Sequence, residues 1–205
     1  MTPDSDVTSS TPERQAALKN ALAKLPPGAN VLDLGAGRGH FTAFLQSLGF
    51  SAIGVDISQV SVSAARAKYP NLRFELATPE GGIPFEDSFF DAVWCSEVIE
   101  HVFDVHAFLS EINRSLKPDG LLVLTTPHHG RIKNLLISLF KFDRHFDPEH
   151  PHIRYFDRAG LERCLKRAGF EPVSCQGIGR FFPVYRAMFA VAGKIGKPGP
   201  PPSSI

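Results

Sequence analysis

The chain of 205 residues contains few cysteines, almost no net charge and no long apolar run. Its three cysteines, Cys95, Cys164 and Cys175, lie far apart without a CxxC pair. This pattern argues against a disulfide framework or a zinc knuckle and favours a reducing, cytoplasmic location. A formal net charge of +1 supplies no bulk attraction for an anionic membrane, DNA or RNA, so neither nucleic acid is an expected partner. The longest apolar run, residues 134–140, is far shorter than the roughly 20 residues that cross a bilayer, so no transmembrane segment is expected.

The two ends of the chain differ in composition from its middle. Residues 1–12 are rich in Ser, Thr and Pro, lack the basic and then apolar order of a signal peptide, and are predicted to be disordered. Residues 196–205, GKPGPPPSSI, favour neither a helix nor a central strand and are also predicted to be disordered. Residues 13–195 remain, and their length predicts a single domain.

Short apolar stretches alternate with amphipathic stretches through this domain. Continuously apolar strands separated by helices indicate a parallel sheet that is covered on both faces. The pattern therefore predicts a doubly wound α/β fold of the Rossmann type. The predicted strands are 30–36, 51–57, 72–77, 90–96, 121–127 and 171–179, and the predicted helices are 39–49, 61–70, 105–120 and 157–170.

Residues 127–155 interrupt this alternation with a long insertion. Its roughly 29 residues exceed the usual connection of 2–6 residues, and five of the eight histidines lie in it. The insertion also combines apolar residues with Arg131, Lys133, Lys141 and Arg144. We predict a lid whose helix packs on the sheet, and the alternative is an amphipathic edge that makes peripheral contact with a membrane.

A glycine-rich turn follows the first predicted strand. Gly35, Gly37 and Gly39 lie where the missing Cβ atoms allow the backbone to approach a ligand closely. Asp56 ends the second predicted strand, where a carboxylate can accept hydrogen bonds from both hydroxyls of a ribose. At this level, enzymes that use a nicotinamide dinucleotide or S-adenosylmethionine both fit, and so does a turn that only packs helix on strand.

The spacing of the glycines separates the two cofactors. They read G-x-G-x-G, and His40 occupies the position where the dinucleotide pattern G-x-G-x-x-G needs its last glycine. Asp33, two residues before the first glycine, would repel a pyrophosphate but suits the ammonium and sulfonium of S-adenosylmethionine.

Four segments in this order resemble the class I S-adenosylmethionine-dependent methyltransferases: VLDLGAGRGHF, GVDIS, IPFEDSFFDAVWCSEVIEHV and EINRSLKPDGLLVLTTP. The resemblance extends through HIRYFDRAGLERCLKRAGFEP and covers about residues 28–173. It implies a seven-stranded sheet whose last strand is antiparallel, and residues 176–195 would supply the final hairpin. It also implies a cofactor site formed by Asp33, Gly35, Ala36, Gly37, Gly39, Asp56, Ile57, Thr78 and Ser96. Many relatives end the third strand with an acid that binds adenine; here Ala77 and Thr78 stand there, so Thr78 or Glu80 would take that role.

Glu97, Glu100 and His101 follow the fourth predicted strand at spacings of i, i+3 and i+4. On a helix these side chains share one face. The acids could simply favour the positive end of a short helix beside a solvated histidine. Alternatively, His101 could act as a general base, or all three could bind a divalent metal ion.

The same segment resembles the ubiquinone-biosynthesis O-methyltransferases and the small-RNA 3′-end 2′-O-methyltransferases. By position, Glu97, Glu100, His101 and His152 match their metal ligands, and His128 and His129 are rival contributors. Oxygen and imidazole ligands suit Mg²⁺, Mn²⁺ or Zn²⁺. We assign catalysis to His101 and Glu100.

The resemblance predicts methylation of a small-molecule hydroxyl that is catechol-like, quinol-like or part of a vicinal diol. Two alternatives stay open. One is a metal-independent methyltransferase that uses a histidine base on another small-molecule or lipid-linked acceptor. The other is a non-catalytic binding module with the methyltransferase fold.

Overall fold

The computed structural model describes residues 11–77, 82–140, 152–182 and 184–200. Thr78 and Glu80, the two residues expected to hold adenine, lie outside these ranges, as does part of the predicted insertion.

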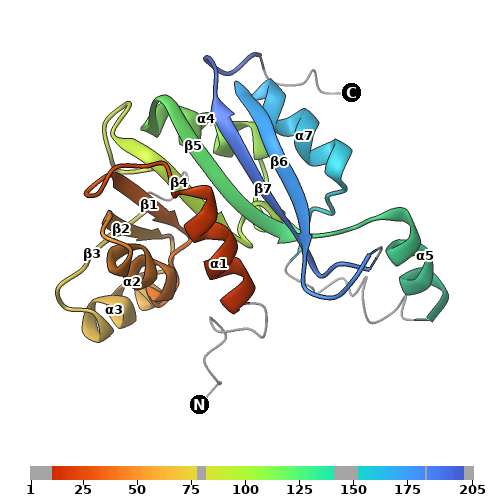
Figure 1. The fold of residues 1–205 in the computed structure, drawn as a ribbon, viewed down its shortest axis with the longest axis horizontal. Coiled ribbons are helices and arrows are strands. Elements are labelled where there is room, and N and C mark those ends of the chain that lie inside the picture. The colour runs from red at the N-terminus through yellow and green to blue at the C-terminus, as the bar shows by residue number, and fades with distance from the viewer. Residues whose placement is uncertain (1–10, 78–81, 141–151, 183, 201–205) are drawn as a thin grey trace.

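A seven-stranded sheet with the order β3-β2-β1-β4-β5-β7-β6 forms the centre of the molecule (Figure 1). All neighbouring strands pair in parallel except β7, which is antiparallel to both β5 and β6. This confirms the predicted seven-stranded, mostly parallel sheet and places its antiparallel hairpin at residues 170–194. The strands are β1 Asn30–Leu34, β2 Ser51–Asp56, β3 Arg73–Leu76, β4 Phe90–Ser96, β5 Leu116–Pro127, β6 Phe170–Ile178 and β7 Ala187–Lys194.

Helices cover both faces of the sheet, as the alternation predicts. The helices are α1 Thr11–Ala21, α2 His40–Ser47, α3 Gln59–Lys68, α4 Val105–Ser115, α5 Arg131–Phe140 and α7 Arg158–Arg167, with a short 3₁₀ helix η1 at Ile99–His101. Three helices begin with side-chain caps. Ser58, Asp104 and Asp157 each accept a hydrogen bond from a backbone N–H three residues later.

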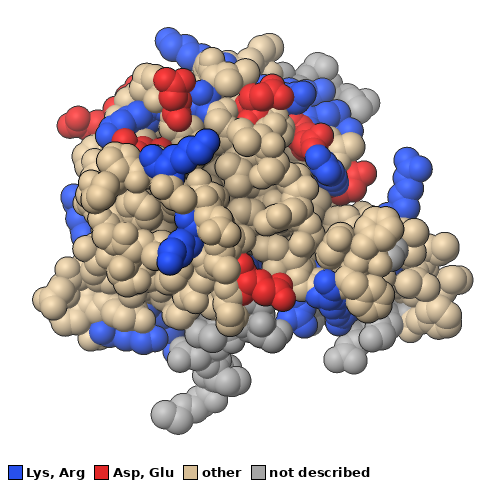
Figure 2. Space-filling view, in the orientation of Figure 1, with Lys and Arg blue, Asp and Glu red and all other residues tan. Residues whose placement is uncertain are grey.

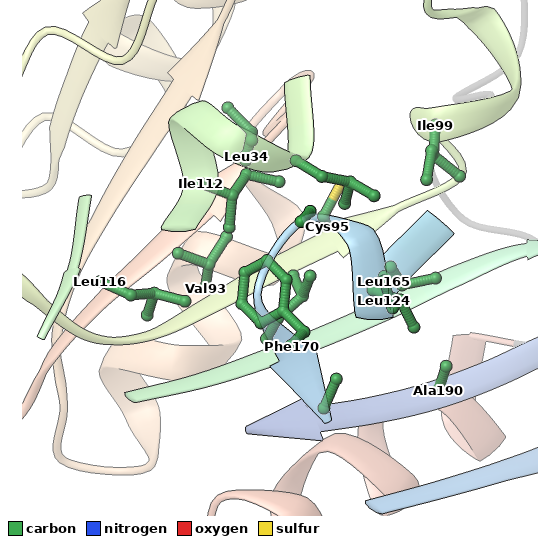
Figure 3. Packing of buried hydrophobic residues seen from close by; sticks show 14 of the residues in the cluster. Leu34, Val93, Cys95, Ile99, Ile112, Leu116, Leu124, Leu165, Phe170 and Ala190 are labelled. Atoms are coloured by element: carbon green, nitrogen blue, oxygen red, sulfur yellow. The ribbon is translucent and has the colours of Figure 1, made fainter. Parts of the chain in front are cut away.

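Successive residues of each central strand point to opposite faces, so the core has two layers. Val31 and Trp94 pack with Leu18 of α1 and Leu45 of α2 on one face. Leu32, Leu34, Val93 and Cys95 pack on the other face with the buried side chains of α4 and α7, as Figure 3 shows for several of them. Fully burying one such side chain stabilises the fold by about 1.5–3 kcal/mol. The strands that carry the candidate site are therefore held from both sides.

The ends of the domain differ slightly from the predicted boundaries. Helix α1 begins at Thr11, inside the segment predicted to be disordered. At the other end, the carbonyl of Gly196 accepts a hydrogen bond from Asn113 (2.9 Å), and the amide of Gly199 donates to the carbonyl of Arg167 (2.9 Å). The first part of the predicted tail is thus attached to the domain.

Helix α5 differs from the expected lid. None of its residues is buried, and it stands away from the sheet in Figure 1. The expectation of a lid helix packed on the sheet is therefore wrong for α5. The packing was predicted from the hydrophobic residues of α5, and most of these residues lie on the side of the helix that faces solvent.

Candidate active site

The glycine turn lies at the carboxyl end of β1, as predicted. Gly35, Gly37 and Gly39 have φ angles of 81°, 52° and 81°, in the left-handed region that favours glycine. A Cβ on Gly35 would overlap the side chain of Val98, and one on Gly39 would lie 2.5 Å from the ring of Phe74. At these two positions the protein itself fills the space, so packing and backbone conformation both require glycine.

Asp56 connects the end of β2 to this turn. One carboxylate oxygen accepts a hydrogen bond from the amide of Gly37 and the other from the amide of Ser58, both at 2.8 Å. Each oxygen has a further lone pair for a ligand hydroxyl. The carboxylate therefore supports the turn and can still bind a ribose.

Asp33 is buried beneath the turn, with 2% of its surface exposed. Its carboxylate accepts a hydrogen bond of 2.6 Å from the hydroxyl of Thr42, which lies on α2. This bond ties the start of α2 to β1. Asp33 thus places a carboxyl group close under the turn while it performs a structural role.

The remaining predicted cofactor residues lie along the same edge of the sheet. The amide of Ala36 donates to the carbonyl of Val55 (3.0 Å) and so completes the turn. Ile57 follows β2 with 66% of its surface exposed, and an apolar side chain there can cover the face of a base. Ser96 ends β4, and its hydroxyl lies 2.9 Å from that of Thr125.

The three residues of the ExxEH segment do not share one helical face. Only residues 99–101 form the short helix η1, and Glu97 precedes it with a φ of 55°. The amide of Glu97 donates to the carbonyl of Thr125 (3.0 Å), which holds this residue against β5. The spacing rule failed because the chain changes direction at Glu97 before the helix begins.

Glu100, His101 and His152 nevertheless come together. One ligand atom from each lies within 4.8 Å of the others, and the rings of His101 and His152 are 4.8 Å apart. The carbonyl of Glu100 accepts the amides of Ile153 (3.0 Å) and Arg154 (3.1 Å), and these bonds bring His152 to η1. Among the described residues, Glu97 is not a member of this group.

Glu100 is fully buried, which does not fit a solvated acid at a helix end. Burial, and then the neighbouring charge of Glu97, raises its pKa to about 8. One carboxyl oxygen accepts a hydrogen bond of 3.1 Å from Thr126, and the other has no hydrogen-bond partner. A buried oxygen without a partner suits a proton or a bound cation.

Arg14 of α1 is a site residue that the sequence did not indicate. It is 7% exposed, donates to the hydroxyl of Ser96 (3.2 Å) and lies 3.8 Å from a carboxylate oxygen of Glu97. The contact with Ser96 joins residues 82 positions apart, and no local pattern marks such a pair. Thr126 was also missed, although two threonines inside an apolar strand, both fully buried, could have drawn attention.

His128 and His129, the rival histidines, lie at the end of β5 but outside the cluster. Burial lowers the pKa of His128 below its ordinary value. The ring of His129 lies 4.8 Å from that of Tyr155, and its Nδ1 is 3.2 Å from the side-chain oxygen of Asn134. Within the described residues, neither histidine belongs to the group formed by Glu100, His101 and His152.

A sheet of this order, with a glycine turn after β1 and an acid ending β2, defines the class of Rossmann-like α/β nucleotide-binding folds. The chain belongs to the family described as "Methyltransferase domain", whose model matches residues 10–175. The family assignment agrees with the resemblance found in the sequence.

Two curated relatives illustrate the range of names in this family. The "Probable S-adenosylmethionine-dependent methyltransferase" of Mycolicibacterium smegmatis is 29% identical over 165 residues, which cover 80% of this chain and 61% of the relative. The ubiquinone biosynthesis O-methyltransferase of Bradyrhizobium diazoefficiens is 40% identical over 118 residues, 56% of this chain and 44% of the relative. The chain thus spans about half the length of the curated relatives it matches.

Solved structures share the fold. The 1,6-didemethyltoxoflavin-N1-methyltransferase of Burkholderia thailandensis superposes with a TM-score of 0.69 at 22% identity, covering 92% of this chain and 79% of that one. Among the helices within the described ranges, none combines the length and the apolar character needed to cross a membrane.

Proposed function

We propose that this chain is an S-adenosylmethionine-dependent methyltransferase that methylates a hydroxyl oxygen of a small molecule beside a divalent metal ion. The acceptor is catechol-like, quinol-like or a vicinal diol. The observation that carries the proposal is the position of two groups at one edge of the sheet. The glycine turn with Asp56 adjoins the group of Glu100, His101 and His152, because Val98 packs directly on Gly35.

The donor side of the site is supported by charge and by hydrogen-bonding capacity. Asp56 has lone pairs left for the two ribose hydroxyls, and the exposed Ile57 offers an apolar surface to the base. Asp33 places a carboxyl group beneath the turn. In its ionised form this group favours a sulfonium and disfavours a pyrophosphate.

The metal side is supported by the unpartnered oxygen of Glu100 and by the types of ligand. One carboxylate and two imidazoles suit Mn²⁺ or Zn²⁺, and Mg²⁺ is acceptable with added water ligands. Two atoms bound to one ion at about 2.1 Å lie at most about 4.2 Å apart. The present spread of up to 4.8 Å would close with small side-chain rotations. Glu97 forms an ion pair with Arg14 close to this group, and it is a candidate fourth metal ligand once that ion pair opens.

In this reaction the acceptor oxygen forms a bond to the methyl carbon while the bond from that carbon to sulfur breaks. The electron pair of the broken bond stays on sulfur, and the hydroxyl proton leaves to water. His101 takes this proton only in the metal-free alternative, because an imidazole bound to a metal ion has no lone pair left to accept it. A bound divalent ion would lower the pKa of the acceptor hydroxyl and orient it. The protein residues chiefly position the two reactants and exclude water from a transfer that neutralises a cation.

Titration calorimetry with S-adenosylmethionine tests the donor site. Asp56→Ala removes two ribose hydrogen bonds worth about 1.5 kcal/mol each, so we expect roughly hundredfold weaker binding. The exposed Glu86 provides the matched control, and Glu86→Ala should bind as the unmodified chain does. Absence of binding at high micromolar donor would favour the non-catalytic binding module instead.

Methyl transfer to a catechol tests the acceptor and the metal. We expect a product heavier by one CH₂, loss of activity in strong chelator, and recovery with Mg²⁺, Mn²⁺ or Zn²⁺. Full activity in chelator would remove the metal from the mechanism and assign the proton transfer to His101 alone. The cytoplasmic location stays a prediction from the cysteine pattern.

A further inference from the structure

Helix α5 presents its apolar side to solvent and its polar side to the protein. The residues at 132, 135, 136, 139 and 140 recur at helical spacing, and they are 53%, 59%, 43%, 65% and 76% exposed: Ile132, Leu135, Leu136, Leu139 and Phe140. The half-buried side of the helix carries Lys133, Asn134 and Ile137. A helix that packs on its own domain has the opposite orientation, with its apolar residues buried and its polar residues exposed.

Two side chains hold the helix in this orientation. The ammonium of Lys133 donates to the carbonyls of His128 (2.7 Å) and Arg186 (3.4 Å). The side-chain amide of Asn134 donates to the carbonyl of His129 (3.3 Å). The polar side of α5 is therefore bound to the end of β5 and to the β6–β7 connection, residues 179–186, and the apolar side is left outward.

The β6–β7 connection extends the apolar surface. Phe181 and Phe182 are 73% and 75% exposed, and Arg180 and Arg186 are exposed next to them. Arg131 is also exposed at the start of α5. No Asp or Glu occurs in residues 128–140 or 176–195. In Figure 2 the lobe formed by α5, at the lower right, is mostly tan with blue at its margins, and one red patch adjoins the blue atoms on its left.

We propose that α5 and the β6–β7 connection together form a surface that binds anionic lipid bilayers. Exposed leucine and phenylalanine side chains insert at the boundary between headgroups and acyl chains, and the surrounding cations attract anionic headgroups. Three exposed arginines, Arg131, Arg180 and Arg186, lie on this surface, against the carboxylate of Glu13, which accepts the amide of Gly179 (2.9 Å). The resulting excess of positive charge favours a lipid surface, because it complements the uniform negative charge of such a bilayer. The chain's net charge of +1 does not oppose this, because membrane attraction falls off within a Debye length and depends on local charge.

Flotation of the full chain with lipid vesicles tests the proposal without donor or acceptor, so its result is independent of the proposed methyl transfer. We expect binding to vesicles of phosphatidylcholine mixed with phosphatidylglycerol, weak binding to phosphatidylcholine alone, and weakening by salt. The double variant Leu135→Ser and Leu139→Ser should bind at least about tenfold more weakly, because it removes two inserted apolar side chains. The matched control is Val173→Ser with Ile195→Ser, at residues that are 69% and 70% exposed elsewhere on the surface.

A second pair of variants tests the cationic margin. Arg131→Gln with Arg180→Gln should lower the affinity for anionic vesicles by about five- to twenty-fold, since each cation near such a surface contributes about 1 kcal/mol. Lys19→Gln with Arg163→Gln makes the same change in net charge on other exposed residues and should leave binding unchanged. Because all these residues are exposed, unchanged thermal unfolding of each variant confirms that the fold is intact.

Three results would overturn the proposal. They are failure of the unmodified chain to float with anionic vesicles, equal flotation of the leucine variant, and self-association that depends on Leu135 and Leu139 in the absence of vesicle binding. The last result would assign the surface to a second copy of the chain.

Discussion

Replacing Glu100 by glutamine should stabilise the metal-free protein, and the gain should depend on pH. The carboxyl is fully buried, and burial together with Glu97 raises its pKa from an ordinary value of 4.5 to about 8. An acid whose pKa is raised on folding leaves stability unaffected below the unfolded pKa. As pH rises from 4.5 to about 8, the unfolded state loses its proton and the folded state retains it. Stability therefore falls across this window and then levels.

The magnitude follows from the two pKa values. At pH 7 the unfolded carboxyl lies about 2.5 pH units above its pKa, and each unit corresponds to about 1.36 kcal/mol, which gives a penalty of about 3 kcal/mol. Glutamine carries no such penalty and can still accept the hydrogen bond of Thr126. Glu100→Gln should therefore match the unmodified protein near pH 4 and exceed its free energy of unfolding by about 3 kcal/mol at pH 7.

Urea unfolding at a series of pH values, in the presence of chelator, measures this difference. Adding Mn²⁺ or Zn²⁺ should stabilise the unmodified protein at pH 8 and have a smaller effect on Glu100→Gln, because the variant lacks the carboxylate ligand. A stability difference that is the same at pH 4 and pH 8 would refute the buried, unpaired carboxyl. Equal stabilisation of both proteins by the metal would refute the role of Glu100 as a ligand.

Three further predictions concern the scaffold and the donor site. Gly39→Ala should lower the free energy of unfolding by about 2–4 kcal/mol, because it combines a positive φ with a clash against an aromatic ring. Gly49→Ala is the matched control, since Gly49 has a φ of 89° and no atom within 4 Å of the added Cβ. Measured by thermal unfolding, it should lower the free energy of unfolding by only about 1–2 kcal/mol. Arg114→Met should cost about 2–4 kcal/mol at pH 7, because the guanidinium binds both carboxylate oxygens of Glu111 (2.7 and 2.8 Å). The hydrogen bonds from Arg114 lower the pKa of Glu111 in the folded protein. Their contribution to stability is therefore present above the ordinary pKa of 4.5 and is lost as pH falls through the pKa of the folded state. If Arg114→Met lowered the free energy of unfolding equally at pH 7 and pH 3, this explanation would be contradicted. Asp56→Ala should strongly reduce the stabilisation by S-adenosylmethionine in thermal shift at a fixed donor concentration, and an unchanged shift would contradict the ribose assignment.

The order of strands and helices could be read from the sequence because it rests on short-range patterns. The apolar stretches before Gly35 and Asp56, and the fourth strand at 90–96, become β1, β2 and β4 with little change. The helix predicted at 105–120 ends instead at Ser115, and residues 116–120 fall within β5. Among the strands within the described residues, β7 lacked a clear local signal, since its pairing with β5 and β6 depends on strands far away in the chain. Helix α1 was not predicted either.

The candidate site was only partly predictable. The sequence placed Glu100, His101 and His152 in one ligand set, and the structure brings these three together. It could not reveal that Glu97 leaves the helical face with a φ of 55° and meets Arg14 instead. That contact spans more than 80 residues and exists only after α1 packs on the sheet.

The sequence by itself determined the family, the doubly wound fold and the glycine turn with its two acids, because each depends on neighbouring residues or on periodicity along one element. Only the tertiary structure decided that Glu100 is buried with one oxygen unpaired, that Arg14 reaches Ser96, and that the apolar side of α5 faces outward. Burial, ion pairing and the direction of an amphipathic face depend on what lies opposite a side chain, and residues distant in sequence supply that environment.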